Sequence, residues 1–174
     1  MNKKSVMVIV RGLPGSGKST FATSVACEVY PGSMRQGMIS GVFETDKFFI
    51  DSQTGEYKFE RDMCEYAHNW NVAEVYRFCR DYPEVPCIVA NTFTTEQEIK
   101  PYRNIANIFN RKVIVVSMQT SHQNVHGVPP EIIEKMKDRW ELVDEDYVIY
   151  DDSQVESAIE ELARKITNRR KKNI

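Results

Sequence analysis

Residues 12–20 of the chain read Gly12-Leu13-Pro14-Gly15-Ser16-Gly17-Lys18-Ser19-Thr20. The stretch from Gly12 to Ser19 matches the pattern G-x-x-x-x-G-K-[ST] at every position. Glycines in such a loop let the backbone turn so that successive N–H groups point inward at a phosphate, and the positive end of the following helix adds to this field. An apolar run precedes the loop and an amphipathic pattern follows it, as the motif requires. The sequence therefore predicts that residues 12–20 bind a nucleoside triphosphate.

Two side chains at the end of this loop have separate predicted roles. Lys18 supplies an ammonium group to the β- and γ-phosphates, and Ser19 offers its hydroxyl group to Mg²⁺. The structural alternative is a glycine-rich turn that binds nothing, but such a turn does not explain why lysine and serine follow the last glycine. We therefore expect Lys18 to act as a catalytic residue and Ser19 to be a metal ligand.

Outward from the loop, strand-like and helix-like segments alternate about five times. Short apolar runs predict strands over residues 5–10, 38–44, 87–90, 112–118 and 146–150. Apolar residues at helical spacing predict helices over residues 21–29, 59–80, 95–109, 129–140 and 153–166. This alternation implies right-handed crossovers and a mainly parallel sheet that is covered on both faces. The predicted fold class is α/β, a P-loop NTPase three-layer α/β/α sandwich with a mainly parallel five-stranded sheet.

The starts of two predicted helices carry a recognisable capping pattern. Thr95 and Glu98 have the spacing of a capping box, and Ser153 and Glu156 repeat it before the last helix. Pro101 follows the first box closely, so it predicts either a kink or a short first turn before the helix.

The composition is typical of one globular domain over residues 1–174. Of the 174 residues, 41% are hydrophobic and 28% are charged, with a net charge of −2. A chain of this size buries roughly 70% of its unfolded surface, so it folds without disulfides or a structural metal. No apolar run approaches the ~20 residues of a membrane span, and the start lacks the features of a secretory signal. We therefore expect a soluble, cytoplasmic protein.

Cysteine, histidine and basic residues give weaker signals. The four cysteines have no CxxC spacing and lie in apolar segments, which predicts buried, reduced thiols. His122 and His126 are four residues apart, but no third ligand is near, so a zinc site is not expected. The basic tail, residues 164–174, carries six basic side chains between Arg164 and Lys172, which could hold a phosphate backbone. A solvated helix end explains the same residues.

Asp46 follows the second predicted strand, at the edge of the sheet where ligands bind in open α/β folds. A carboxylate at that position can accept the proton of a hydroxyl group as its oxygen attacks a phosphate. Asp46 is therefore the candidate catalytic base. The structural alternative is a helix N-cap, which is a common role for aspartate, and one residue can fill both roles.

The ends of the third and fourth predicted strands supply further polar groups. Asn91 and Thr92 can hydrogen-bond to a phosphate or a magnesium-bound water, or can form an Asx turn. Residues 119–130 lie where a lid would close over the nucleotide. No arginine occurs between Lys112 and Arg139, so His122, His126, Lys135 or Arg139 would have to supply the positive charge of the lid.

Together these motifs resemble the small P-loop kinases related to polynucleotide 5′-hydroxyl kinase, especially a kinase-like ATP-binding branch that is labelled as an AAA domain. The resemblance covers roughly residues 6–141. Besides the loop, it rests on short motifs spread along the chain: Thr45-Asp46-x-Phe48-Phe49, Tyr57-x-Phe59, Ala67-His68-x-Trp70, Asn91-Thr92, His126-Gly127-Val128-Pro129 and Met136-x-x-Arg139-Trp140-Glu141.

The resemblance implies ATP and Mg²⁺ as cofactors, Asp46 as the base that activates an acceptor hydroxyl, and residues 119–130 as a lid. His68 and Trp70 are then packing residues on the acceptor side. The chain departs from the polynucleotide kinases at Phe49, where they have an arginine that holds the acceptor phosphate.

Three functions are compatible with these observations. The first is an ATP-dependent kinase that transfers the γ-phosphate to a hydroxyl acceptor, with the 5′-hydroxyl end of a polynucleotide as one candidate. The second is an ATP-binding interaction module, or a slow ATPase, without a true acceptor. The third is a nucleic-acid binder that uses the basic segment 164–172.

Overall fold

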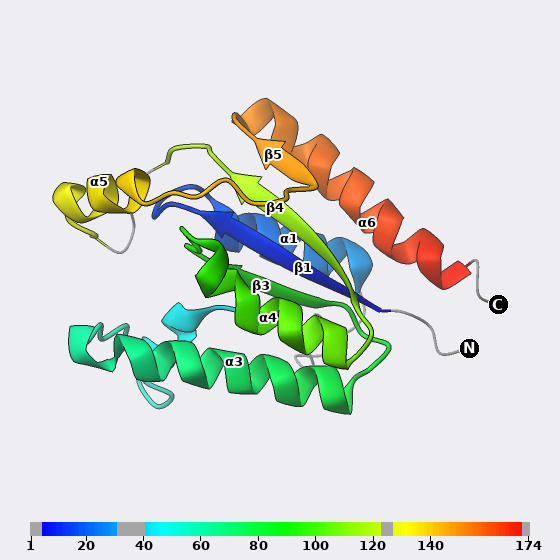
Figure 1. The fold of residues 1–174 in the computed structure, drawn as a ribbon, viewed down its shortest axis with the longest axis horizontal. Helices are drawn as coiled ribbons and strands as arrows, with labels where there is room; N and C mark the ends of the chain where they lie inside the picture. The colour runs from blue at the N-terminus through cyan, green and yellow to red at the C-terminus, as the bar shows by residue number, and fades with distance from the viewer. Residues whose placement is uncertain (1–4, 31–40, 123–126, 172–174) are drawn as a thin grey trace.

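A parallel five-stranded sheet forms the centre of the computed structural model, which describes residues 5–30, 41–122 and 127–171. The strand order is β2-β3-β1-β4-β5, and every neighbouring pair is parallel (Figure 1). The strands are β1 (Val6–Gly12), β2 (Val42–Phe43), β3 (Cys87–Asn91), β4 (Lys112–Met118) and β5 (Tyr147–Ile149). The predicted parallel sheet is thereby confirmed. Residues 38–40 of the second predicted strand lie outside the described residues.

Helices cover both faces of this sheet. The α-helices are α1 (Lys18–Val29), α3 (Cys64–Asp81), α4 (Glu96–Ile108), α5 (Pro130–Asp138) and α6 (Val155–Lys171). Short 3₁₀ helices are η1 (Thr45–Phe49), η2 (Arg61–Met63) and η3 (Asp152–Gln154). Helices α1 and α6 pack together on one face, and α3 and α4 pack together on the other (Figure 1). The three-layer sandwich predicted from the sequence is confirmed.

Alternate side chains of β1 enter two separate cores. Val8 and Val10 pack with the apolar faces of α1 and α6, whereas Met7 and Ile9 pack with those of α3 and α4. A strand that is buried on both faces cannot alternate apolar and polar residues, which explains the continuous apolar run that precedes the loop. The loop that follows β1 consequently starts from a strand that is buried along its whole length.

Helix α3 begins later than the sequence predicts, at Cys64 instead of Phe59. Residues 50–57 form a short hairpin, closed by an antiparallel bridge between Ile50 and Tyr57, and η2 follows it. The apolar spacing that predicts this helix includes Tyr66, yet Tyr66 is 66% exposed. The buried face of the helix is instead formed by Ala67, Asn71, Val75, Phe78 and Cys79.

One of the two predicted capping boxes is present. The side chain of Thr95 accepts a hydrogen bond from the Glu98 N–H, and the Glu98 carboxylate accepts one from the Thr95 N–H. Pro101 lies within α4 itself. The second predicted box was wrong, because the carboxylate of Asp151 accepts hydrogen bonds from both the backbone and the hydroxyl group of Ser153.

The four cysteines are free thiols, but only Cys79 and Cys87 are buried. Cys27 is exposed on α1 and Cys64 is partly exposed, so the prediction of burial was wrong for these two. Across the three described ranges, no helix combines the length and the apolar character that crossing a membrane requires.

Candidate active site

The loop between β1 and α1 is held from several sides. The Gly12 N–H donates to the Thr92 carbonyl oxygen at 3.2 Å, and the Ser16 N–H donates to the Leu13 carbonyl oxygen at 3.1 Å. Gly15 and Gly17 have φ angles of 80° and 76°, in the left-handed region that glycine tolerates best. The loop therefore has the tight, glycine-dependent turn that the motif predicts.

Local features of the loop fit a bound polyphosphate. A Cβ atom on Gly12 would lie 2.7 Å from the Met118 carbonyl oxygen, so the backbone has no room for a side chain there. The Ser16 hydroxyl is buried, and it forms no hydrogen bond with the residues that the structure describes. Helix α1 begins at Lys18 without a side-chain cap, so its first N–H groups are suited to an anion.

Lys18 lies at the mouth of the loop. Its Nζ atom donates to the Leu13 carbonyl oxygen at 3.2 Å. Burial lowers the pKa of the Lys18 ammonium group, and the negative charges of Asp46 and Glu44 partly oppose this shift. The two carboxylates are therefore within electrostatic range of the ammonium group, which brings together two of the predicted site residues.

Asp46 is exposed in η1, directly after β2. The N-cap of η1 is Glu44 and not Asp46, so the alternative role of Asp46 as a helix cap is not observed. The Tyr57 hydroxyl donates to Asp46 Oδ1 at 3.5 Å. The carboxylate thus lies at the carboxyl edge of the sheet with one phenol beside it.

Asn91 positions the backbone next to Asp46. At the end of β3, its Oδ1 atom accepts a hydrogen bond of 2.7 Å from the Thr45 N–H. Its Nδ2 atom is buried and has no hydrogen-bond partner in the described part of the chain. This contact between neighbouring strands differs from the Asx turn that the sequence also allowed, and it ties η1 to the strand beside β1.

The start of the predicted lid, residues 119–122, packs directly on the phosphate-binding loop. The Thr120 hydroxyl donates to the Ser16 carbonyl oxygen at 2.6 Å, and the His122 N–H donates to the Gly15 carbonyl oxygen at 2.7 Å. The His122 imidazole lies over Gly17, and its Nε2 atom is 3.0 Å from Asp152 Oδ1. His126 lies outside the described residues.

The cations of α5 and of the turn after it are engaged away from the loop. Arg139 Nη2 lies 4.0 Å from Glu98 Oε1 on α4, and Lys137 Nζ lies 2.6 Å from Glu134 Oε1. Lys135 is exposed. Neither predicted cation, Lys135 or Arg139, has a contact with the loop among the interactions that the structure records for its described residues.

The two residues that the resemblance assigns to packing, His68 and Trp70, have unequal surroundings. Trp70 packs against Phe48, with 5.8 Å between ring centroids. His68 is exposed, and its Nδ1 atom lies 3.4 Å from the Thr45 hydroxyl. His68 is therefore a polar neighbour of η1 and not a core residue.

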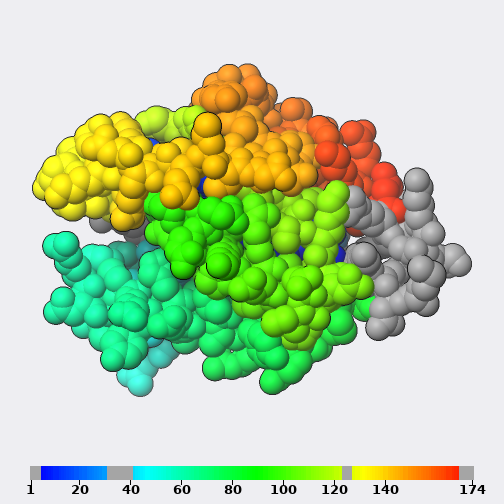
Figure 2. Space-filling view, viewed as in Figure 1, coloured from blue at the N-terminus to red at the C-terminus, as the bar shows by residue number. Residues whose placement is uncertain are grey.

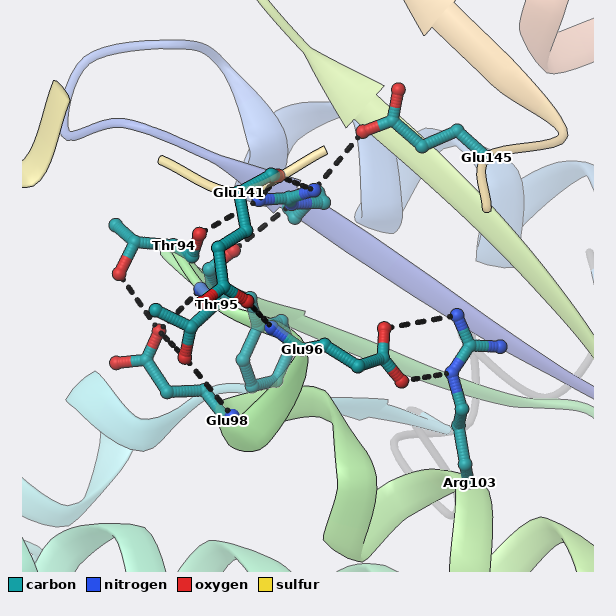
Figure 3. A network of polar contacts seen from close by, with 9 residues as sticks. Thr94, Thr95, Glu96, Glu98, Arg103, Glu141 and Glu145 are labelled. Carbon is teal, nitrogen blue, oxygen red and sulfur yellow. Dashed lines mark hydrogen bonds and ion pairs between the residues drawn. The ribbon is translucent and has the colours of Figure 1, made fainter. Parts of the chain in front are cut away.

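A polar network around Arg11 was missed in the sequence. Arg11 precedes Gly12 and is fully buried. Its guanidinium donates to the carbonyl oxygens of Phe93, Thr94 and Glu141 at 2.9–3.1 Å and to the Glu145 carboxylate at 3.1 Å. Figure 3 shows Thr94, Glu141 and Glu145 converging from different segments. A charged residue within an apolar strand was the signal that could have revealed this network.

The Arg11 network joins the loop strand to the segment that follows α5. The Trp140 ring lies over the guanidinium, 3.9 Å from ring centroid to Cζ. The Glu141 carboxylate accepts a hydrogen bond of 2.8 Å from the Glu96 N–H at the start of α4. The chain after the predicted lid is consequently anchored to β1 and to α4.

A parallel sheet of this order, with a glycine-rich loop joining β1 to α1 and a second helical layer, defines a P-loop NTPase of the kinase-like type. The chain belongs to the AAA domain family, because the model of that family matches residues 7–127.

Individual proteins are similar to this chain in sequence or in fold. NEDD4-binding protein 2 of Homo sapiens is 30% identical over 146 residues, which cover 78% of this chain and 8% of that much longer protein. Kti12 of Chaetomium thermophilum in complex with ADP-AlF3 superimposes with a TM-score of 0.61 at 12% identity, covering 92% of this chain and 98% of that one. APS kinase of Mycobacterium tuberculosis in complex with AMPPNP and APS gives 0.54 at 14% identity, covering 98% and 99%.

Proposed function

We propose that this protein is an ATP-dependent kinase that transfers the γ-phosphate of ATP to a hydroxyl acceptor, with the 5′-hydroxyl end of a polynucleotide as the candidate acceptor. The observation that carries the proposal is the glycine-rich loop with Lys18, together with the Asp46 carboxylate at the carboxyl edge of the same sheet. The Lys18 ammonium group donates to the Leu13 carbonyl oxygen of the phosphate-binding loop, and the Asp46 carboxylate follows β2, which is separated from β1 by β3, within electrostatic range of that group. In this proposal, the nucleotide and the base Asp46 share the carboxyl edge of the sheet.

In the proposed reaction, Asp46 takes the proton of the acceptor hydroxyl group while the oxygen of that hydroxyl group forms a bond to the γ-phosphorus. The bond from that phosphorus to the oxygen of ADP breaks, and ADP leaves with the electron pair. Lys18 and the N–H groups of the loop stabilise the charge that spreads over the phosphate oxygens.

Ser19 is the proposed protein ligand of Mg²⁺. Its hydroxyl is exposed at the start of α1, directly after Lys18. In the described ranges, no group of three or more His, Cys, Asp or Glu side chains could hold a metal ion. A single hydroxyl nevertheless fits, because Mg²⁺ at such sites is held mostly by water and phosphate oxygens. When bound, Mg²⁺ supplies positive charge to the phosphates.

Replacing the proposed base tests the reaction. Asp46→Asn keeps the shape of the side chain but removes proton acceptance, so we expect kcat to fall by about 100-fold or more. The affinity for ATP, measured by calorimetry with Mg²⁺, should change less than about twofold. Asp81→Asn is the matched control, because Asp81 is exposed at the far end of α3. Undiminished phosphate transfer by Asp46→Asn would exclude Asp46 as the base.

The ion pair of Arg139 favours a second function, an ATP-binding interaction module or slow ATPase. Because Arg139 faces Glu98, it does not supply the lid cation that fast phosphoryl transfer commonly uses. ADP release with and without 5′-hydroxyl DNA, 5′-hydroxyl RNA, nucleosides and sugars distinguishes the two functions. A rate that no acceptor increases would favour the module.

A further inference from the structure

A small group of exposed aromatic side chains lies beside Asp46. Phe59 is 56% exposed and Tyr57 is 37% exposed, although both are large apolar rings. Tyr57 closes the hairpin of residues 50–57, which links η1 to η2, and Phe59 follows this hairpin. Because exposed aromatic rings next to a reactive group commonly form a contact surface, we call Tyr57 and Phe59 the aromatic platform.

The aromatic platform is held in place by the core. The Lys58 N–H donates to the Phe49 carbonyl oxygen at 2.8 Å, which fixes the chain between the two rings. Phe49 is buried, and its ring centroid lies 5.1 Å from that of Phe59 and 6.2 Å from that of Tyr57. Two exposed rings therefore rest on one buried ring, so little side-chain freedom is lost when a planar ligand stacks on them.

The platform adjoins the proposed base through Tyr57. The Tyr57 hydroxyl donates to Asp46 Oδ1 at 3.5 Å. Burial and the negative charge of Asp46 raise the pKa of Tyr57 to about 12, which agrees with a phenol held close to a carboxylate. An acceptor that places its hydroxyl at Asp46 would consequently place its neighbouring atoms over the rings.

A cation lies close to the same place. Arg61 is exposed in η2, directly after the platform. Burial raises the pKa of the Cys64 thiol, the positive charge of Arg61 lowers it, and the negative charge of Asp46 raises it. Arg61 follows Phe59 by two residues, so the chain itself brings this exposed cation next to the platform. Its guanidinium can therefore supply positive charge for an acceptor phosphate.

We propose that the aromatic platform is the acceptor subsite, and that it stacks the nucleobase of a nucleoside or polynucleotide acceptor while Arg61 contacts its phosphate. This inference rests on the proposed kinase function and names its substrate class. Single-stranded nucleic acid is commonly bound by aromatic rings together with cations that follow its backbone, because every base has a face that can stack. A plain sugar acceptor would leave both rings unused.

Direct binding tests the subsite without phosphate transfer. The probes are a 5′-hydroxyl DNA decamer labelled at its 3′ end and the same decamer with abasic sites at its first three positions, and the readout is fluorescence anisotropy. The intact decamer should bind the wild-type protein roughly 5- to 100-fold more tightly than the abasic decamer, since stacking contributes about that much per base. Phe59→Leu should remove this preference, and Phe59→Trp should retain it.

Tyr76→Leu is the matched control. Tyr76 is also partly exposed, and its centroid lies 5.1 Å from that of Phe109, the same separation as between Phe59 and Phe49. It lies on α3 against the end of α4, away from Asp46. The control should keep the wild-type preference for the intact decamer.

The outcomes separate the subsite from the kinase function. Equal affinity for the two decamers, or no detectable binding of either, would overturn the aromatic subsite even if transfer to another acceptor depends on Asp46. The absence of binding to either decamer is also expected if the rings dock another protein. A preference that Phe59→Leu abolishes would support the subsite, and Asp46→Asn then tests the transfer step by itself.

Discussion

Arg11 shows how a single buried charge organises the loop edge. Burial lowers the pKa of its guanidinium, whereas the charge and the hydrogen bond of Glu145 raise it. The side chain remains charged because a guanidinium is protonated throughout the accessible pH range. Its N–H groups donate to the carbonyl oxygens of Phe93, Thr94 and Glu141, so removing the side chain would take these hydrogen bonds away from the three oxygens.

We expect Arg11→Met to lower the free energy of unfolding by about 3 kcal/mol, because breaking a buried charge network on one side leaves its partners unpaired. Urea denaturation followed by circular dichroism measures this change. Arg103→Met is the control, since Arg103 forms a partly exposed pair with Glu96 whose loss should cost less than about 1 kcal/mol. Similar losses for the two variants would contradict the role given to Arg11.

Between elements, a buried polar pair joins α3 to α4 within their shared apolar core. The Asn71 side chain donates to the Tyr102 hydroxyl at 2.9 Å, and both residues are buried. Burial raises the pKa of Tyr102 to about 12. The folded state therefore holds the phenolic proton more tightly than the unfolded chain does, in which the pKa is about 10.

The raised pKa predicts the pH dependence of this helix pair. The contribution of Tyr102 to the free energy of unfolding is fully present below pH ~10. It is lost as the pH rises toward ~12, because in this range the phenol ionises readily only in the unfolded chain. Relative to Tyr102→Phe, the wild-type protein should lose about 1.4 kcal/mol of unfolding free energy between pH 9 and pH 11. Urea titrations of both proteins at these pH values measure the difference. A difference that stays constant would show that Tyr102 ionises normally.

Elements also show where sequence patterns are reliable. The helical spacing of Phe21, Val25 and Val29 predicted the buried face of α1, because that helix lies flat on the sheet. The same reasoning was wrong at the start of α3. There Phe59 and Tyr66 are exposed, and the hairpin that precedes the helix changes which side chains can reach the core.

In the whole molecule, the phosphate-binding loop is assembled from distant parts of the chain. Gly12 contacts the carbonyl of Thr92 after β3, while Ser16 and Gly15 contact Thr120 and His122 after β4. A ligand that binds this loop therefore stabilises several layers at once. Figure 2 shows an indentation between α5 and the N-terminal part of α3.

We expect ATP with Mg²⁺, at about 100 times its Kd, to stabilise the protein by about 2.7 kcal/mol and to raise Tm by roughly 5–10 °C. Lys18→Ala should show a much smaller rise, since the phosphates lose their ammonium partner. Lys100→Ala, at an exposed position on α4, should respond like the wild-type protein. Differential scanning fluorimetry provides the measurement. An unchanged response in Lys18→Ala would exclude its proposed role.

Local spacing and short-range backbone geometry were enough to predict the loop, the alternation of strands and helices, and hence the parallel sandwich. The folded molecule was needed to find the partners of Arg11, the use of Asn91 to hold Thr45, and the grouping of Tyr57 and Phe59 near Asp46. Each of these contacts joins residues that are separated by turns and crossovers. Their distances are set by how the layers pack, and periodicity along the chain carries no information about that.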